Sequence, residues 1–158
     1  MYKILFVCTG ATCRSPMASA IFNHKVRQYN ISGLKSSFCG LSVQYGSEIN
    51  AKGKAALKSI GIKRVCGKPE QISGKHLVEN NLIVCMTEDQ KQALQISVAE
   101  KYLPKIVCVK DFCGADITDP YGYDQSTYDM CRHQIEEAVE KIIGVLLGNG
   151  VAKQKKSV

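Results

Sequence analysis

Two side chains near the start of the chain have the types and spacing needed for phosphoryl transfer. Cys8 follows an apolar run, and Arg14 comes after five intervening residues. A thiolate is a strong nucleophile, and a helix N-terminus or a neighbouring arginine favours it over the thiol. The planar guanidinium of an arginine can hold two oxygens of one phosphate group. The pair therefore indicates a nucleophile for phosphorus and a clamp for its oxygens.

The residues around this pair predict a loop that binds an anion. Residues 4–7 are continuously apolar and predict a buried strand, and Ser15-Pro16 marks a helix start, since Ser favours the N-cap and Pro the first helical position. A short strand–loop–helix connection points backbone N–H groups and the positive helix end at one place. We expect a phosphate-binding loop made of Thr9, Gly10, Ala11, Thr12, Cys13 and Arg14.

Short apolar strands alternate with helical patterns along the rest of the chain. The expected strands are residues 4–7, 37–43, 82–86 and 106–109, and the expected helices are 15–29 and those beginning near residues 50, 87 and 126. Residues 62–80 predict a loop with at most one helical turn. This alternation predicts an α/β fold with a parallel sheet between helices on both faces.

The same topology predicts that a late acidic residue meets Cys8. Ligands of parallel sheets bind beyond the carboxyl ends of the strands. Cys8 ends the first strand, and the loop after the fourth strand, residues 111–123, ends at the same edge. We therefore expect Asp119, in that loop, to lie over Cys8.

Length and charge indicate one domain with a basic first half. The chain has 158 residues and a net charge of +7, with +9 in residues 1–80 and −2 in residues 81–158. The lysines are scattered and no stacking aromatic motif accompanies them, which argues against nucleic acid. No apolar run reaches the roughly 20 residues of a membrane span. We expect one domain, residues 1–148, and a flexible basic tail, residues 149–158.

The eight cysteines are expected to be reduced thiols. The chain begins directly with a strand and leaves no room for a secretory signal, and its length suffices for a core without disulfides. Two pairs of cysteines, Cys8 with Cys13 and Cys108 with Cys113, have four residues between them, but no pair of histidines completes a zinc site. The sequence predicts a cytoplasmic protein without a metal or cofactor.

In these features the chain resembles the low-molecular-weight protein tyrosine phosphatases over the whole length of the expected domain. The specific motifs are Val7-Cys8-x5-Arg14-Ser15-Pro16-Met17-Ala18 and Asp119-Pro120-Tyr121, with weaker echoes in Cys39-Gly40-Leu41 and Cys85-Met86. The resemblance implies a three-layer sandwich with strand order 2-1-3-4. It also implies hydrolysis of phosphotyrosine in proteins, or of small aryl phosphates, by a monomer that associates with itself weakly at most.

The resemblance also implies a role for each site residue. Cys8 would form a phosphocysteine while Arg14 holds the oxygens, and Asp119 would protonate the leaving group and then activate water. Ser15 would donate a hydrogen bond to the Cys8 sulfur. Cys13 would form a reversible disulfide with Cys8 under peroxide. A reactive thiolate with a second cysteine nearby is the usual arrangement of redox-sensing sites.

Four residues are expected to flank the substrate: Tyr121, Tyr45, Thr9 and Thr12. Three departures from the family pattern affect the support of the loop. Ala11 stands where an Asn is usual, Cys66-Gly67 stand where a His is expected, and Thr87 replaces an acidic residue. An Ala side chain cannot form the hydrogen bonds of that Asn.

Two other functions remain open at this level. An arsenate reductase of the same fold passes oxidation to two further thiols; Cys85 lies near the right region, but no second cysteine follows in residues 86–107. Asp119-Pro120-Tyr121 favours phosphate esters instead. The third reading is a binding module for phosphate or phosphotyrosine that has lost turnover.

Overall fold

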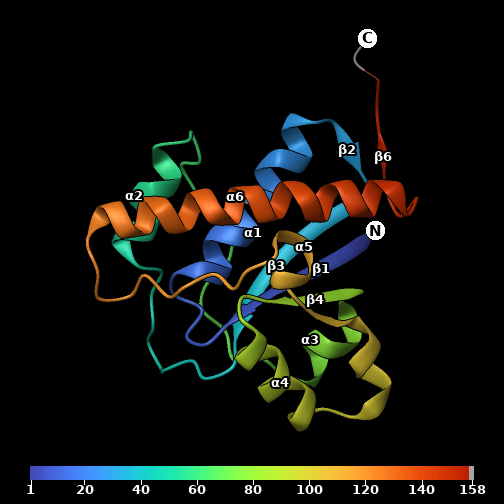
Figure 1. Cartoon of the computed structure of the whole chain (residues 1–158), viewed down its shortest axis with the longest axis horizontal. Helices are drawn as coiled ribbons and strands as arrows, with labels where there is room; N and C mark the ends of the chain where they lie inside the picture. Colours follow the sequence, from blue (N-terminus) through green and yellow to red (C-terminus); the bar gives the residue numbers. More distant parts are fainter. Residues whose placement is uncertain (157–158) are drawn as a thin grey trace.

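A four-stranded parallel sheet forms the centre of the molecule (Figure 1). The computed structural model describes residues 1–156. The strands are β1 (Tyr2–Cys8), β3 (Leu34–Gly40), β4 (Leu82–Cys85) and β5 (Ile106–Cys108), in the order β3-β1-β4-β5. Numbered as the sequence predicted them, this order is 2-1-3-4, so the predicted sheet is confirmed.

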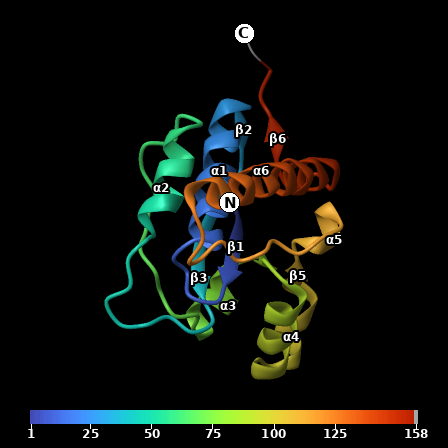
Figure 2. The same cartoon turned by 60° about the vertical axis from the view of Figure 1, so that its left-hand side comes forward.

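Helices cover both faces of the sheet (Figures 1 and 2). One side carries α1 (Arg14–Gln28), α2 (Ala51–Lys58) and α6 (Gln125–Gly148), and the other carries α3 (Gly74–Glu79) and α4 (Glu88–Ser97). A 3-10 helix, η1 (Glu100–Lys105), leads into β5, and the short α5 (Lys110–Cys113) follows it. The three-layer α/β sandwich is thus confirmed.

Strand β1 is central because residues 4–7 are apolar on both faces. Ile4 and Phe6 pack in the core cluster shared with α1 and α6, while Leu5 and Val7 pack with residues of α3 and α4. All four are fully buried. A parallel strand buried on both faces reads as a continuous apolar run, and this run holds Cys8 firmly at the end of the strand.

Strand β3 lies three residues earlier than the sequence predicted. It pairs with β1 residue for residue, from Tyr2 with Leu34 to Cys8 with Gly40. Residues 41–43, which were expected to continue the strand, instead turn towards the loop after Cys8. The amides of Leu41 and Ser42 donate to the carbonyls of Cys8 and Thr9. The predicted strand is confirmed for residues 37–40 and was wrong for residues 41–43, because the amides of Leu41 and Ser42 have partners in the loop.

Several short elements differ from what the sequence predicted. Residues 31–32 form β2 (Ile31–Ser32), which pairs antiparallel with β6 (Lys153–Gln154) in the predicted tail. The flexibility of that tail stays a prediction, and residues 157–158 lie outside the described residues. Helix α3 is longer than the single turn expected in 62–80, and α5 lies in the predicted loop. Within residues 1–156, no helix is both long and apolar enough to cross a membrane.

Candidate active site

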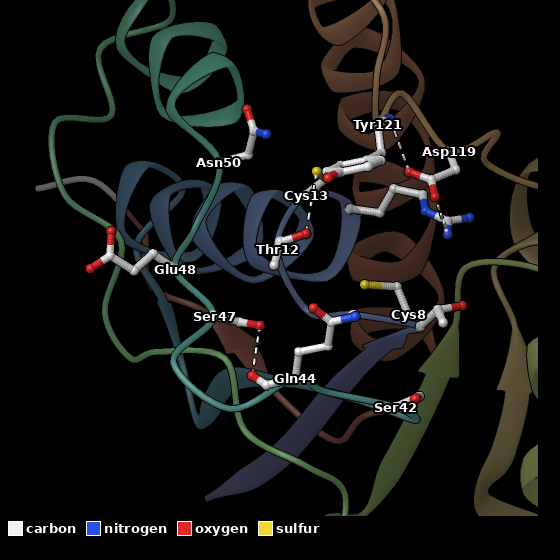
Figure 3. A pocket seen from close by; sticks show the side chains of 13 residues that line it. Cys8, Thr12, Cys13, Ser42, Gln44, Ser47, Glu48, Asn50, Asp119 and Tyr121 are labelled. Carbon is white, nitrogen blue, oxygen red and sulfur yellow. Dashed lines mark hydrogen bonds and ion pairs between the residues drawn. The ribbon is translucent and has the colours of Figure 1, made fainter.

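The loop between β1 and α1 wraps one end of a cavity of about 520 Å³ (Figure 3). Strand β1 ends at Cys8 and α1 begins at Arg14, so the predicted loop residues connect the two directly. The cavity is lined by Cys8, Thr9, Gly10, Thr12, Cys13, Arg14, Ser42, Gln44, Ser47, Glu48, Asn50, Asp119 and Tyr121. Ala11 is fully buried behind the loop and does not line it.

The Cys8 sulfur has a hydrogen-bond partner at the start of α1. Its Sγ lies 3.0 Å from the hydroxyl oxygen of Ser15, which is fully buried. The same hydroxyl lies 3.3 Å from the carbonyl oxygen of Cys39. A hydroxyl has one proton to donate. When Cys8 is a neutral thiol, the Ser15 hydroxyl can donate this proton to the carbonyl of Cys39; when Cys8 is a thiolate, it can donate it to the sulfur. Ser15 can therefore stabilise the nucleophilic form of Cys8.

The Arg14 side chain is fixed by the segment that follows β5. Its Nη1 donates to the carbonyl oxygen of Ile117 at 2.9 Å, and its Nη2 lies 3.6 Å from Oδ2 of Asp119. The Arg14 side chain is only 6% exposed, whereas that of Asp119 is 54% exposed. The guanidinium is thus held rigidly beside the loop, and the carboxylate stands at the cavity mouth.

A turn after Ile117 places Asp119 and Tyr121 on the same wall (Figure 3). Oδ1 of Asp119 accepts a hydrogen bond of 3.1 Å from the amide of Tyr121. This contact closes a local turn of the kind that Asp-Pro sequences favour. The carboxylate keeps its other oxygen towards Arg14, and the Tyr121 ring is two-thirds exposed at the mouth.

Backbone hydrogen bonds support the loop at the point where Ala11 replaces the expected Asn. Ala11 has a φ of 56°, in the left-handed region that residues other than Gly and Asn rarely adopt. On either side of it, the carbonyl of Thr9 accepts from the amide of Ser42 at 2.9 Å, and that of Thr12 accepts from the amide of Asn50 at 2.9 Å. The segment between β3 and α2 therefore holds the loop from outside.

Gly40 allows this segment to approach the loop. A Cβ added at Gly40 would lie 2.7 Å from the carbonyl oxygen of Thr9 and 3.1 Å from the amide nitrogen of Ala11. Contacts this short with backbone atoms cannot be relieved by rotating a side chain. The family-like Cys39-Gly40-Leu41 sequence thus has a steric reason at its middle position.

Gln90 is a supporting residue that the sequence did not identify. Its Nε2 donates to the hydroxyl of Thr9 at 3.1 Å, while its Oε1 accepts from the amides of Met86 and Thr87 at 3.1 Å each. The Gln90 side chain is buried. Thr87 and Gln90 also form the capping box at the start of α4, and this spacing is the only signal of Gln90 in the sequence.

Cys13 lies at the other end of the loop, against α6. Its sulfur is 3.3 Å from the hydroxyl of Tyr128 and 3.6 Å from that of Thr12. Burial raises the pKa of the Cys13 thiol, and the two hydrogen bonds offset this only in part. Cys13 is therefore a neutral thiol at neutral pH.

The predicted substrate-flanking residues divide into two groups. Thr9, Thr12 and Tyr121 line the cavity, as expected. The side chain of Tyr45 is fully exposed and does not line it. Gly46, at a φ of 76°, turns the chain next to Tyr45, and Gln44 and Ser47 face the cavity instead. The prediction that Tyr45 flanks the substrate therefore has no support in this arrangement.

The sequence also missed most of the polar wall opposite Asp119. This wall comes from the segment before α2 and contains Ser42, Gln44, Ser47, Glu48 and Asn50. Hydrogen bonds with the phosphate loop hold this segment at the cavity. These contacts form only in the folded chain, so no sequence motif marks the residues.

Comparison with known proteins agrees with this geometry. The family described as "Low molecular weight phosphotyrosine protein phosphatase" matches residues 3–157. One relative, a protein-arginine-phosphatase of Geobacillus stearothermophilus, is 31% identical over 144 residues, covering 89% of this chain and 93% of its own.

Solved structures match over almost the whole fold. An arginine phosphatase from Geobacillus stearothermophilus superposes with a TM-score of 0.86 at 29% identity, covering 96% of each chain. A low molecular weight protein tyrosine phosphatase from T. tengcongensis gives 0.85 at 30% identity, covering 92% of this chain and all of its own. The chain therefore belongs to the low molecular weight phosphotyrosine protein phosphatase family, a family of hydrolases.

Proposed function

We propose that the protein hydrolyses phosphorylated protein side chains through a phosphocysteine on Cys8, with phosphotyrosine as the leading substrate. The observation that carries the proposal is the position of the Cys8 sulfur in a cavity shared with Arg14 and Asp119. Ser15 at 3.0 Å and the rigid Arg14 guanidinium support a thiolate nucleophile and a bound phosphate, respectively.

In the first step, the Cys8 thiolate attacks phosphorus opposite the leaving oxygen. A sulfur–phosphorus bond forms and the phosphorus–oxygen bond to the phenol breaks. The loop amides and Arg14 hold the remaining phosphate oxygens and stabilise their charge in the transition state. Asp119, protonated beforehand, donates its proton to the departing phenolate.

In the second step, water attacks the phosphocysteine. Asp119, now a carboxylate, accepts a proton from this water as the oxygen–phosphorus bond forms and the sulfur–phosphorus bond breaks. Phosphate leaves and Cys8 returns to a thiolate, which Ser15 stabilises. Because the Asp119 carboxylate is half exposed at the cavity mouth, both the leaving group and water can reach it.

Phosphoarginine is a second candidate substrate. Among residues 1–156, Tyr121 is the one aromatic side chain in the cavity lining, and Thr9, Thr12 and Gln44 make the wall around it polar. Hydroxyl, amide and carboxylate groups suit a guanidinium better than a phenyl ring. The name of the Geobacillus relative, a protein-arginine-phosphatase, points in the same direction.

Arsenate reduction has less support than hydrolysis. It would need further thiols that can reach Cys8, but within the described residues Cys8 and Cys13 are the only cysteines in the cavity lining. Cys85 is fully buried, and burial raises its pKa to about 12. A thiol in this environment is a poor relay for oxidation.

The test is hydrolysis of p-nitrophenyl phosphate between about pH 4.5 and 8, with vanadate as inhibitor. Wild type is expected to turn over and Cys8→Ser to be inactive. Asp119→Ala should lose roughly 10²–10⁴-fold with phenyl phosphate, whose leaving group needs a proton, and less with p-nitrophenyl phosphate. Full activity of Cys8→Ser would refute the mechanism, and phosphate binding without turnover would indicate the binding module instead.

Matched peptides separate the two substrates. One peptide sequence is prepared with phosphotyrosine and with phosphoarginine, and kcat/KM is measured for each. A higher value for phosphotyrosine supports the leading proposal, and a higher value for phosphoarginine assigns the polar wall to the guanidinium.

The proposal also includes a monomeric protein in the cytoplasm. All eight cysteines are free thiols in the structure, which suits a reducing compartment. Light scattering of the purified protein tests the monomer.

A further inference from the structure

A second hollow, of about 830 Å³, lies next to the candidate active site. It is bounded by the segment before α2, by α2 itself and by residues 62–69. Figure 2 shows the two flanking segments leaving opposite ends of α2 and running down the same side of the molecule. We call this hollow the basic groove, after the five cations that line it: Lys54, Lys58, Lys63, Arg64 and Lys68.

The charge of the basic groove is not neutralised by the protein. All five cations are exposed, and within residues 1–156 none of them forms an ion pair. Among the residues that the structure describes, Glu48 contributes the only carboxylate in the lining. Like charges gathered around one hollow raise the local potential and attract an anionic partner.

The groove lies beside the active-site cavity and shares one wall with it. Ser47 and Glu48 line both hollows, so the segment before α2 forms the wall between them. In Figure 3 the Glu48 side chain points away from Cys8. A chain whose phosphorylated side chain enters the cavity can therefore cross this wall and place its neighbouring residues in the basic groove.

The lining also indicates what kind of chain fits. Leu57 and Ile62 are buried at its base, and Val65 and Pro69 are partly exposed beside the cations. Within the described part of the chain, no aromatic side chain on which a nucleic-acid base could stack belongs to the lining. A floor of aliphatic groups with a cationic rim suits a peptide that alternates acidic and apolar residues.

We propose that the basic groove binds an acidic segment of the protein substrate, next to the phosphorylated residue. The inference rests on the proposed function, because it makes this groove part of the same substrate's binding surface. Exposed ion pairs at an interface mainly affect encounter and binding rather than chemistry. The groove should therefore lower KM for acidic substrates and leave kcat unchanged.

The kinetic test uses peptides that differ only in charge. A phosphotyrosine peptide with three Glu residues on the N-terminal side, one with them on the C-terminal side, and Gln versions of both are compared. We expect KM for one of the Glu peptides to be about tenfold below its Gln version at low salt, and this difference to shrink as salt screens the charges.

Two triple variants test whether the basic groove causes the lower KM for the Glu peptide. Lys58→Gln, Lys63→Gln and Arg64→Gln together should abolish the advantage of the Glu peptide. The control variant combines Lys110→Gln, Lys141→Gln and Lys156→Gln, which remove the same charge from exposed positions outside both hollows. This variant should retain the advantage of the Glu peptide. Hydrolysis of p-nitrophenyl phosphate should be the same in all three proteins. Equal KM for Glu and Gln peptides, or equal loss in both variants, overturns the proposal.

A binding measurement keeps this test separate from catalysis. Titration of the 15N-labelled protein with the unphosphorylated Glu peptide should shift backbone amides in residues 54–68, and the Gln peptide should not. If the wild type hydrolyses nothing, the proposed function fails while this titration still decides on the groove. Shifts produced by a single-stranded oligonucleotide or by vesicles with phosphatidylserine, but not by the Glu peptide, would assign the groove to another anion and overturn the proposal.

Discussion

The side-chain amide of Gln90 donates a 3.1 Å hydrogen bond to the hydroxyl of Thr9, 81 residues away in the chain. Thr9 is the first residue of the phosphate loop, and Gln90 lies in the first turn of α4. The Oε1 atom of the same side chain accepts hydrogen bonds from the backbone amides of Met86 and Thr87, which follow β4. One buried side chain therefore connects the loop, the end of β4 and the start of α4.

This link predicts that Gln90 and Thr9 are energetically coupled. Gln90→Leu leaves the amides of Met86 and Thr87 without this acceptor and should lower the free energy of unfolding by about 1–3 kcal/mol. In a double-mutant cycle of Gln90→Leu and Thr9→Val, urea unfolding should give a coupling of about 0.5–1.5 kcal/mol. Strictly additive effects would show that the hydrogen bond contributes nothing.

The close approach at Gly40 predicts a strong effect of a single methyl group. Gly40→Ala places a Cβ against the carbonyl oxygen of Thr9 and should destabilise the fold by about 1–3 kcal/mol while displacing the loop. Both the urea midpoint and kcat with p-nitrophenyl phosphate should fall.

Gly74 provides a matched control for that substitution. A Cβ added at Gly74, at the start of α3, meets no atom within 4 Å. Gly74→Ala should be neutral or slightly stabilising, because Ala restricts the unfolded chain more than Gly does. A Gly40→Ala protein as stable and active as Gly74→Ala would contradict the steric argument.

The position of Cys13 in the same cavity lining as Cys8 predicts reversible inactivation by peroxide. Oxidation of Cys8 to a sulfenic acid followed by attack of Cys13 would expel water and form a disulfide, which dithiothreitol then reduces. Wild type treated with peroxide should recover most of its activity, and Cys13→Ser should not, because its sulfenic acid proceeds to irreversible forms. Mass spectrometry should find a Cys8–Cys13 peptide in wild type alone.

Glu140 predicts an acid-dependent contribution to stability. Burial acts to raise the pKa of Glu140, but hydrogen bonds from Lys25, at 2.6 Å, and from Tyr29 outweigh it and hold the pKa below the ordinary value of 4.5. A carboxyl group with a lowered pKa in the folded state stabilises the fold above its unfolded pKa. This contribution is lost as pH falls through the folded pKa.

The free energy of unfolding of the wild type should therefore decrease as pH is lowered from 5 to 3. That of Glu140→Gln should decrease less over the same range. The difference should be about 0.5 kcal/mol, since the group is partly exposed and such pairs are weak. Glu100→Gln, which removes an exposed carboxylate that forms no ion pair within residues 1–156, should follow wild type.

The sequence by itself determined the parts of the site that are local in the chain. Cys8, Arg14 and Ser15 lie within eight consecutive residues, so the strand before them and the helix after them suffice to bring them together. The apolar run of residues 4–7 likewise predicted a strand buried on both faces of the sheet. The strand order itself was implied by the family resemblance. Asp119 was expected at this edge because parallel strands end there together.

Only the tertiary structure decided what supports and surrounds that loop. The amides of Ser42 and Asn50 and the side chain of Gln90 reach it from other elements, and their partners depend on packing rather than on spacing in the chain. For the same reason the sequence placed Tyr45 at the substrate, whereas the turn at Gly46 directs it into solvent. The basic groove likewise exists only where α2 meets residues 62–69, because charges scattered along a chain become one surface when folding brings them together.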